Sequence, residues 1–290
     1  MRRSFKEALA SGEFLVTAEV VPQKGIDAGT LTPIIKDLND VVDALSVPDN
    51  PRALMSMSAC AISRLILENG GDAIMHVSCR DRNRIALQSD LLGAAFLGIR
   101  NILCINGDHV RFGDHIDAMP VYDLDSVQLL ETVRSLTQGR DMAGQQLVGI
   151  PDFCVGTAAN PEADPLPPQL LKFEKKVQFG IDFVQTHPVF NIDNLVPFVN
   201  QAREKGVKLI AGVRLLMAEE ASSYKDGSYP GLFIPEDLLA EIEGIKVEKS
   251  VEIAAQLIKA MREKKLCDGV HISAPGYEPK IMDIIKAAGI

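Results

Sequence analysis

Apolar and polar positions along the chain form two alternating patterns: short runs rich in β-branched residues, and longer amphipathic stretches. Eight of the short runs have the length and composition of buried strands, and they are Phe14 to Val21, Val41 to Val47, Ala73 to Cys79, Asn101 to Asn106, Leu147 to Gly156, Asp182 to Pro188, Val207 to Val213 and Asp268 to Ser273. The helical period predicts helices near residues 28–39, 53–68, 82–97, 123–137, 166–179, 191–204, 235–263 and 277–287.

Strands that alternate with helices in this way pair in parallel through right-handed crossovers. Eight such units in 290 residues match a closed (β/α)8 TIM barrel better than an open doubly wound sheet, so we expect one α/β barrel domain over residues 1–290. No Gly-x-Gly-x-x-Gly or P-loop motif supports a Rossmann or P-loop nucleotide site. The longest irregular stretch, Ser222 to Pro235, is expected to be a loop over the barrel mouth or a plain surface turn.

Charge and hydropathy exclude some classes of partner. The net charge is −9 with acidic and basic residues interspersed, so no nucleic acid is expected as a partner. No apolar run reaches the roughly 18 to 20 residues of a membrane span, and the first residues lack the apolar core of a signal peptide. We therefore expect a cytoplasmic protein without a membrane span, whose apolar outer helices would allow an oligomer.

The cysteines are odd in number, widely scattered and embedded in apolar segments; they are Cys60, Cys79, Cys104, Cys154 and Cys267. This pattern indicates reduced thiols that pack as small core side chains, rather than disulfides or metal ligands. We expect no metal site made by this chain.

In such a barrel the active site forms at the C-terminal ends of the strands, so polar residues there are the candidates for function. They are Glu19, Ser46 to Asn50, His76, Asn106 to His109, Thr157, Asn160, Gln185, His187, Arg214, His271 and Ser273. Carboxylates, amides and histidines around an apolar mouth suit a redox cofactor and a polar heterocycle better than acyl or phosphoryl transfer.

The two candidate carboxylates each allow two interpretations. Glu19 lies in an apolar strand, where burial would raise its pKa and favour proton donation near neutral pH. An ion pair between Glu19 and Lys24 or Arg214 explains the same position equally well. Asp108 follows Gly107 directly after the fourth strand, so it could enter the mouth or instead cap a turn or helix.

Three basic residues also have competing interpretations. His76 lies within a strand, where a buried histidine bonded to a backbone carbonyl is the commoner arrangement. His187 ends the sixth strand, directly before Pro188, and is better placed to meet a ligand. Lys176 lies late in a helix, where lysines are usually solvated unless an anion lies nearby.

Seven segments, in one order along the chain, together resemble the methylenetetrahydrofolate reductase family. They are Val16 to Gly25, Cys79 to Arg84 with Leu87 to Gly93, Gly98 to His109, Lys175 to Gly180, Asp182 to Phe190, Gly231 to Pro235, and Gly269 to Ile272. The similarity extends from the first strand to the last helix. Any one segment would be a weak signal, but seven in the same order are specific.

The resemblance implies a flavin oxidoreductase of one-carbon metabolism that holds FAD, in preference to FMN, noncovalently at the C-terminal face of the barrel. In this family, hydride passes through flavin N5 to the methylene carbon of 5,10-methylenetetrahydrofolate and gives 5-methyltetrahydrofolate. Segments Cys79 to Arg84 and Asn106 to His109 are most similar to a branch of anaerobic one-carbon metabolism. By this resemblance, electrons come from NADH, NADPH or a redox partner subunit that carries iron–sulfur or zinc sites.

The resemblance also assigns roles to individual residues. Glu19 matches the acid that protonates the folate so that its five-membered ring opens to an iminium, and Asp108 matches an aspartate beside flavin and pterin. Expected cofactor contacts are His76, Asn106, Gly107, Asp108, Asn160 and Lys176. Expected folate contacts are Glu19 and Asp108, together with His187 or Gln185. His187 stands where the family has a folate-binding glutamine, and because Gln185 and His187 lie two apart on a strand and share a face, either could reach the mouth.

Three positions depart from the family's pattern and keep other functions open. Pro48 stands where threonine is usual, Asn106 where threonine or arginine is frequent, and His187 where the family has a folate-binding glutamine. One alternative is a pterin-binding barrel that transfers a methyl group and binds no flavin. Another is a non-catalytic flavin subunit of a larger redox complex.

Overall fold

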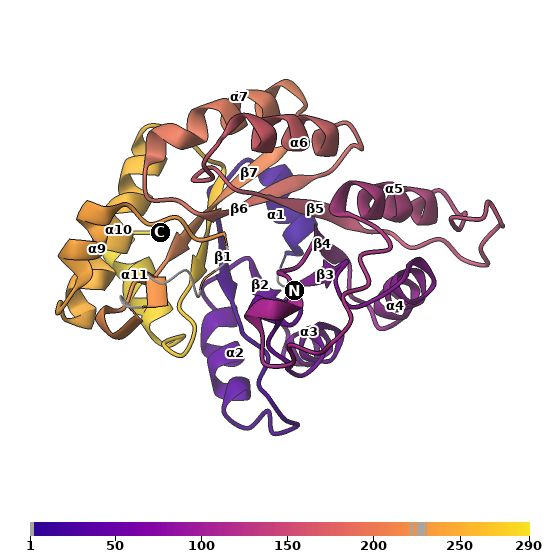
Figure 1. Ribbon diagram of the computed structural model, residues 1–290, viewed down its shortest axis with the longest axis horizontal. Helices are drawn as coiled ribbons and strands as arrows, with labels where there is room; N and C mark the ends of the chain where they lie inside the picture. Colours follow the sequence, from indigo (N-terminus) through magenta and orange to yellow (C-terminus); the bar gives the residue numbers. More distant parts are fainter. Residues whose placement is uncertain (1–2, 221–222, 225–228, 230) are drawn as a thin grey trace.

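The computed structural model describes residues 3–220, 223, 224, 229 and 231–290. Within these residues eight parallel strands pair in chain order, and β1 also pairs with β8, which closes the sheet into a barrel (Figure 1). The strands are β1 Leu15–Glu19, β2 Ala44–Val47, β3 Ala73–Ser78, β4 Asn101–Ile105, β5 Cys154–Ala159, β6 Phe183–Pro188, β7 Lys208–Arg214 and β8 Gly269–Ser273. The expected (β/α)8 TIM barrel is confirmed.

The helices other than α1 surround the ring of strands, whereas α1 lies within the ring in the view of Figure 1. The described helices are α1 Phe5–Ser11, α2 Leu31–Asn39, α3 Ala59–Glu68, α4 Arg84–Phe96, α5 Ser126–Thr137, α6 Pro167–Val177, α7 Val196–Glu204, α9 Glu236–Ile242, α10 Val247–Glu263 and α11 Lys280–Ala288. Short 3-10 turns follow four of the strands: η1 Pro51–Ala53, η2 Val110–Phe112, η3 Ile192–Leu195 and η4 Ala218–Glu220. Among the described residues, no helix combines the length and the apolar content that crossing a membrane requires.

The barrel interior is apolar at the end where the strands begin. Seven strands each contribute one buried side chain to this layer, namely Leu15, Ala44, Ile74, Leu103, Cys154, Phe183 and Ile210. Helix α1 packs into the same layer, where the Phe5 ring meets the Phe183 ring edge-on with 5.2 Å between centroids. Helix α1 therefore closes the N-terminal end of the barrel.

The interior becomes polar toward the other end. Because side chains two residues apart on a strand point the same way, the next inward positions follow directly from the apolar layer. They are Thr17 and then Glu19 on β1, Ser46 on β2, His76 on β3, Gln185 on β6 and His271 on β8. The strand period therefore places a set of polar side chains at the C-terminal mouth.

One predicted strand is wrong over most of its length. The expected strand Leu147 to Gly156 begins only at Cys154, and residues 138–153 form an irregular excursion with one isolated bridge between Arg140 and Gln146. Gly149 has φ +85° and Pro151 has no amide hydrogen, so neither residue continues a strand ladder. The N-terminal helix α1 was not expected at all.

Two further expectations need correction. The single helix expected over residues 235–263 is two helices, α9 and α10, separated at Gly244, whose φ is +80°. Residues 106–125, which contain only the short turn η2, form a longer irregular stretch than Ser222 to Pro235. Within that second stretch, residues 222, 225–228 and 230 lie outside the described residues, and its expected role stays a prediction.

Candidate functional site

A cavity of about 450 Å³ opens at the C-terminal ends of the strands. It is lined by all nine residues that the resemblance assigned to the cofactor or the folate, which are Glu19, His76, Asn106, Gly107, Asp108, Asn160, Lys176, Gln185 and His187. Of the other candidates at the strand ends, Ser46, Val47, His109 and Thr157 are not among the lining residues. The nine lining residues come from β1, β3, the loop after β4, the end of β5, α6 and β6. The closed order of the strands thus brings together side chains that lie up to 168 positions apart in the sequence.

Glu19 is the last residue of β1 and lines the cavity. Burial raises its pKa to about 7, while the charge of Arg214 opposes that rise and Glu278 adds to it. The two cations suggested as ion-pair partners of Glu19 have other carboxylates as their main contacts. Lys24 pairs with Asp114, and Arg214 lies 3.4 Å from Glu220. A substantial fraction of Glu19 therefore carries a proton at neutral pH.

The cavity floor carries two neutral histidines. His76 Nε2 lies 2.7 Å from the Ser46 hydroxyl, not against a backbone carbonyl, and that hydroxyl also lies 3.5 Å from the Gln185 amide oxygen. His271 Nδ1 lies 3.1 Å from the Thr17 hydroxyl. Burial lowers the pKa of both His76 and His271 to about 3, so both rings are uncharged at neutral pH.

Asp108 stands at the lip of the cavity, just after β4. Its Oδ2 accepts a hydrogen bond from the Arg52 backbone amide at 3.1 Å. Burial raises the pKa of Asp108, whereas His187 and the Arg52 amide oppose the rise. Gly107 makes the turn possible, because its φ is +81° and a Cβ there would lie 2.1 Å from Ser78 Oγ.

Both candidate folate-binding residues of β6 line the cavity. The pairing of β6 with β7 shifts register between Gln185 and Pro188, so the strand is irregular at this point. Gln185 lies deeper, against Ser46, while the His187 ring lies beside Gly231 from the loop after β7. Burial lowers the pKa of His187, and the charge of Asp108 opposes that change.

Helix α6 supplies cations to one side of the cavity. Lys176 is buried and donates to the Ala158 carbonyl at 2.6 Å, so the view of it as a solvated surface lysine is wrong. Burial and the neighbouring Lys172 lower the pKa of Lys176 to about 7. Asn160, at the same side, donates to the Gly231 carbonyl at 2.8 Å.

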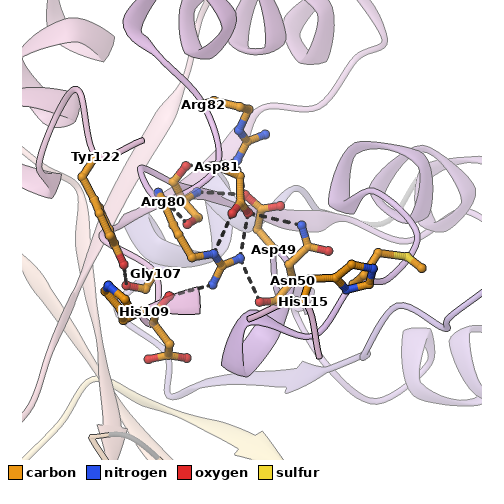
Figure 2. A network of polar contacts seen from close by, with 12 residues as sticks. Asp49, Asn50, Arg80, Asp81, Arg82, Gly107, His109, His115 and Tyr122 are labelled. Carbon is orange, nitrogen blue, oxygen red and sulfur yellow. Dashed lines mark hydrogen bonds and ion pairs between the residues drawn. The ribbon is translucent and has the colours of Figure 1, made fainter. Parts of the chain in front are cut away.

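Sequence reasoning missed several residues at the mouth, among them Gln169 and Lys172 of α6, Tyr229 and Arg80. Arg80 belongs to a polar network that joins the loops after β2, β3 and β4 (Figure 2). In the same network, Tyr122 donates to the Gly107 carbonyl at 3.0 Å. The sequence signals for Arg80 were its place in the charged run that directly follows β3 and the family resemblance of the segment Cys79 to Arg84, and neither assigned it a role.

The five cysteines are free thiols, four of them buried. The described residues contain no group of three or more histidine, cysteine, aspartate or glutamate side chains arranged to hold a metal ion. The chemistry available at the mouth thus comes from a proton-donating carboxyl, neutral imidazoles, amides and two lysines. This set can hold a polar heterocycle and deliver a proton to it.

Comparisons with known proteins agree with one another. The profile of the family described as methylenetetrahydrofolate reductase matches residues 4–289. Methylenetetrahydrofolate reductase 1 of Schizosaccharomyces pombe is 24% identical over 230 residues, which cover 76% of this chain and 36% of that protein. The probable methylenetetrahydrofolate reductase (NADPH) of Caenorhabditis elegans is 26% identical over 257 residues, covering 84% of this chain and 36% of that protein. The chain thus spans about 36% of the length of these relatives.

Solved structures share the fold at low sequence identity. A protein from Clostridium thermocellum that binds two copies of 5-methyl-5,6,7,8-tetrahydrofolic acid superposes with a TM-score of 0.66 at 13% identity, covering 98% of this chain and 97% of that one. EDTA monooxygenase from Chelativorans sp. BNC1 gives a TM-score of 0.58 at 11% identity, covering 96% and 93%. At such identities these likenesses establish the barrel fold alone.

Proposed function

The chain belongs to the methylenetetrahydrofolate reductase family, and we propose that it reduces 5,10-methylenetetrahydrofolate to 5-methyltetrahydrofolate with a bound flavin. The observation that carries this proposal is Glu19, a largely buried carboxyl with a pKa of about 7 and a side chain 18% exposed, at the mouth of the cavity. A group with that pKa can donate a proton at neutral pH and recover it from solvent, as a general acid must.

The residues at the mouth fit a flavin. Gly107 lines the cavity and has no side chain, so a flat ring can approach its backbone closely. Lys172 and Lys176 supply cations for phosphate groups, and we favour FAD over FMN because two lysines match the two phosphates of a dinucleotide. His76, Asn106, Asp108 and Asn160 would contact the remaining polar edges. When bound, the flavin supplies hydride transfer to the folate carbon.

Glu19 would act on the substrate through its proton. Transfer of that proton to a ring nitrogen of the methylene bridge breaks the carbon–nitrogen bond, and the bonding electron pair stays on the nitrogen that gains the proton. The methylene carbon then becomes an electrophilic iminium ready to accept hydride. Arg214 keeps the pKa of Glu19 from rising further against burial, so the carboxylate left behind is stabilised by its charge.

Asp108, Gln185 and His187 would orient the pterin. Asp108 offers carboxylate oxygens to the donor edge of the ring, and the Gln185 amide both donates and accepts. His187, which stands where the family has glutamine, presents a ring nitrogen on the same side of β6. A barrel of the same fold binds 5-methyltetrahydrofolic acid, which supports a folate as the ligand of this chain without locating it.

We propose NADH, NADPH or a redox partner protein as the source of electrons, and a cytoplasmic location. One relative carries NADPH in its name, which supports a nicotinamide donor for that protein. For this chain the donor would have to approach the mouth, because α1 closes the other end of the barrel.

Purification and anaerobic mixing test the proposal. The purified protein should show the absorbance of oxidised flavin, and that absorbance, once bleached by a reductant, should return when 5,10-methylenetetrahydrofolate is added without oxygen. A colourless protein that binds 5-methyltetrahydrofolate would instead indicate a flavin-free methyltransferase. Bound flavin that no folate reoxidises would indicate a non-catalytic flavin subunit. Either outcome would overturn the proposal.

A further inference from the structure

Arg80 has an unusual environment for an arginine. It directly follows β3, and only 2% of its side chain is exposed, although it lines the mouth of the cavity. Buried guanidinium groups are rare unless they are paired and fully hydrogen-bonded. The hydrogen-bond partners of Arg80 therefore indicate its structural role.

The guanidinium group makes four hydrogen bonds, and Figure 2 shows it at the centre of the network, with Asp81 and Asn50 beside it. Nε and Nη2 donate to the two carboxylate oxygens of Asp81, each at 2.7 Å, which fixes the plane of the group. Nη1 donates to the Asp108 carbonyl and Nη2 to the Asn50 carbonyl, each at 3.1 Å. One side chain after β3 thus holds the backbones of the loops after β2 and β4.

The other residues of the charged run Cys79 to Arg84 have different contacts. Arg82 also bonds the loop after β2, because it donates to the Asp49 carboxylate, but its remaining hydrogen bonds go to the Ser78 carbonyl and to Asp90, not to the loop after β4. Asn83 caps helix α4 by accepting from the Ile85 and Ala86 amides. Arg84 donates to Asp123 at 2.9 Å on the surface, where half of its side chain is exposed. Arg80 is therefore the member of the run that reaches the cavity.

One of the two loops that Arg80 holds has an unusual backbone. In the loop after β2, Asn50, Arg52 and Ala53 all have left-handed backbones, with φ of 45°, 55° and 58°. Residues other than glycine adopt that conformation only where their surroundings determine it. The Arg52 amide in this loop is the group that donates to the Asp108 carboxylate. Both the backbone and the side chain of Asp108 thus depend on this junction.

We propose that Arg80 is a positioning residue: with its plane fixed by Asp81, it holds the Asn50 and Asp108 backbones so that the Asp108 carboxylate faces the ligand. This inference deepens the proposed function and rests on it for the identity of the ligand. The charge of Arg80 adds an electrostatic effect. Burial raises the pKa of Asp108, while His187, the Arg52 amide and the Arg80 charge each lower it.

Two substitutions separate geometry from charge. Arg80→Lys keeps the positive charge, but a single ammonium group cannot hold Asp81 and both carbonyls in one plane. Arg80→Met keeps a similar stem and loses both charge and donors. Arg84→Lys is the matched control, since it changes an arginine of the same run whose carboxylate partner lies on the surface.

The first readout is amide hydrogen exchange at Arg52 in the protein without ligand. The Arg52 amide should exchange roughly tenfold faster in both Arg80 variants and at the wild-type rate in Arg84→Lys. The second readout compares reoxidation of the reduced flavoprotein by methylenetetrahydrofolate with reoxidation by menadione. The folate rate should fall roughly 10- to 100-fold, as expected for a group displaced by about 1 Å, while the menadione rate stays unchanged.

The third readout separates charge from geometry. The pH midpoint that reports Asp108 in the folate reaction should rise in Arg80→Met and stay in place in Arg80→Lys.

Wild-type exchange at Arg52 together with an unchanged ratio of folate to menadione rates in both variants would overturn the proposal and leave Arg80 a fold-stabilising residue. If Arg80→Met does not fold, Arg80→Lys and Asp81→Asn carry the test. If the wild-type protein binds no flavin, the proposed function fails, and exchange at Arg52 still decides whether Arg80 holds the loop.

Discussion

The Glu19 carboxylate lies 4.0 Å from Nε2 of His271, and this contact is not an ion pair at neutral pH. Burial lowers the pKa of His271 to about 3, so the imidazole carries no positive charge to hold Glu19 ionised. Burial also raises the pKa of Glu19 to about 7. A neutral histidine beside a buried acid thus preserves a proton that a protonated histidine would have displaced.

The first prediction concerns the Glu19 proton. Glu19→Gln keeps the size and polarity of the side chain, so flavin binding and flavin reduction should persist. Reoxidation by methylenetetrahydrofolate should slow by roughly 10² to 10⁴, the usual contribution of a general acid. Anaerobic stopped-flow absorbance measures both half-reactions. Folate-dependent reoxidation at the wild-type rate would refute the acid role.

The second prediction concerns pH. If Glu19 must be protonated, the rate of the folate half-reaction should be highest below pH 7 and fall as pH rises through about 7, the pKa of Glu19. Glu278→Gln should move the midpoint downward, because Glu278 is one of the causes that raise the pKa of Glu19. A midpoint that does not respond to Glu278→Gln would assign the titration to another group.

The third prediction concerns the cations of α6. Lys176→Met should weaken flavin binding by roughly tenfold or more, the effect of losing one charge-assisted hydrogen bond to a phosphate. Lys175→Met is the matched control, because Lys175 is adjacent in sequence, exposed, and absent from the cavity lining. Fluorescence titration of the flavin-free protein with FAD and with FMN gives both affinities. Equal losses in the two variants would remove Lys176 from the cofactor site.

The fourth prediction concerns the turn after β4. Gly107→Ala should destabilise the fold by about 1–3 kcal/mol, because alanine is strained at φ +81° and its Cβ would meet Ser78 Oγ. Gly93→Ala in α4 is the control: nothing lies within 4 Å of its added Cβ, so it should stabilise the fold by about 0.5–1 kcal/mol. Denaturant unfolding measures both changes. A neutral Gly107→Ala would show that the turn relaxes at no cost.

The barrel and its polar mouth could be predicted because both follow from short-range rules. Strand ends in a parallel barrel share one face, so Glu19, His76, Gln185 and His187 could be assigned to one site before their distances were known. All of them line the same cavity. The alternation along β1 and β3 also explains why Glu19 and His76 point inward while their neighbours pack against helices.

What could not be predicted depends on long-range contacts. Arg80 looked like one charge in a charged run, and only the spatial neighbours Asn50 and Asp108 give it a role. Lys176 was expected at the cofactor only through the family resemblance, because helix periodicity alone does not show that its ammonium group is buried and donates to the Ala158 carbonyl. β5 begins only at Cys154 because Gly149 and Pro151 interrupt the apolar run that was expected to be a strand from Leu147.

The short helix α1, whose Phe5 packs against Phe183 at the N-terminal end of the barrel, limits how ligands can reach the interior. Because α1 closes the N-terminal end of the barrel, every ligand has to enter through the C-terminal mouth. In the proposed reaction, the electron donor and the one-carbon acceptor would both bind in this one cavity. The oxidised donor would then leave before the acceptor binds. Initial-rate plots at several fixed donor concentrations should accordingly run as parallel lines.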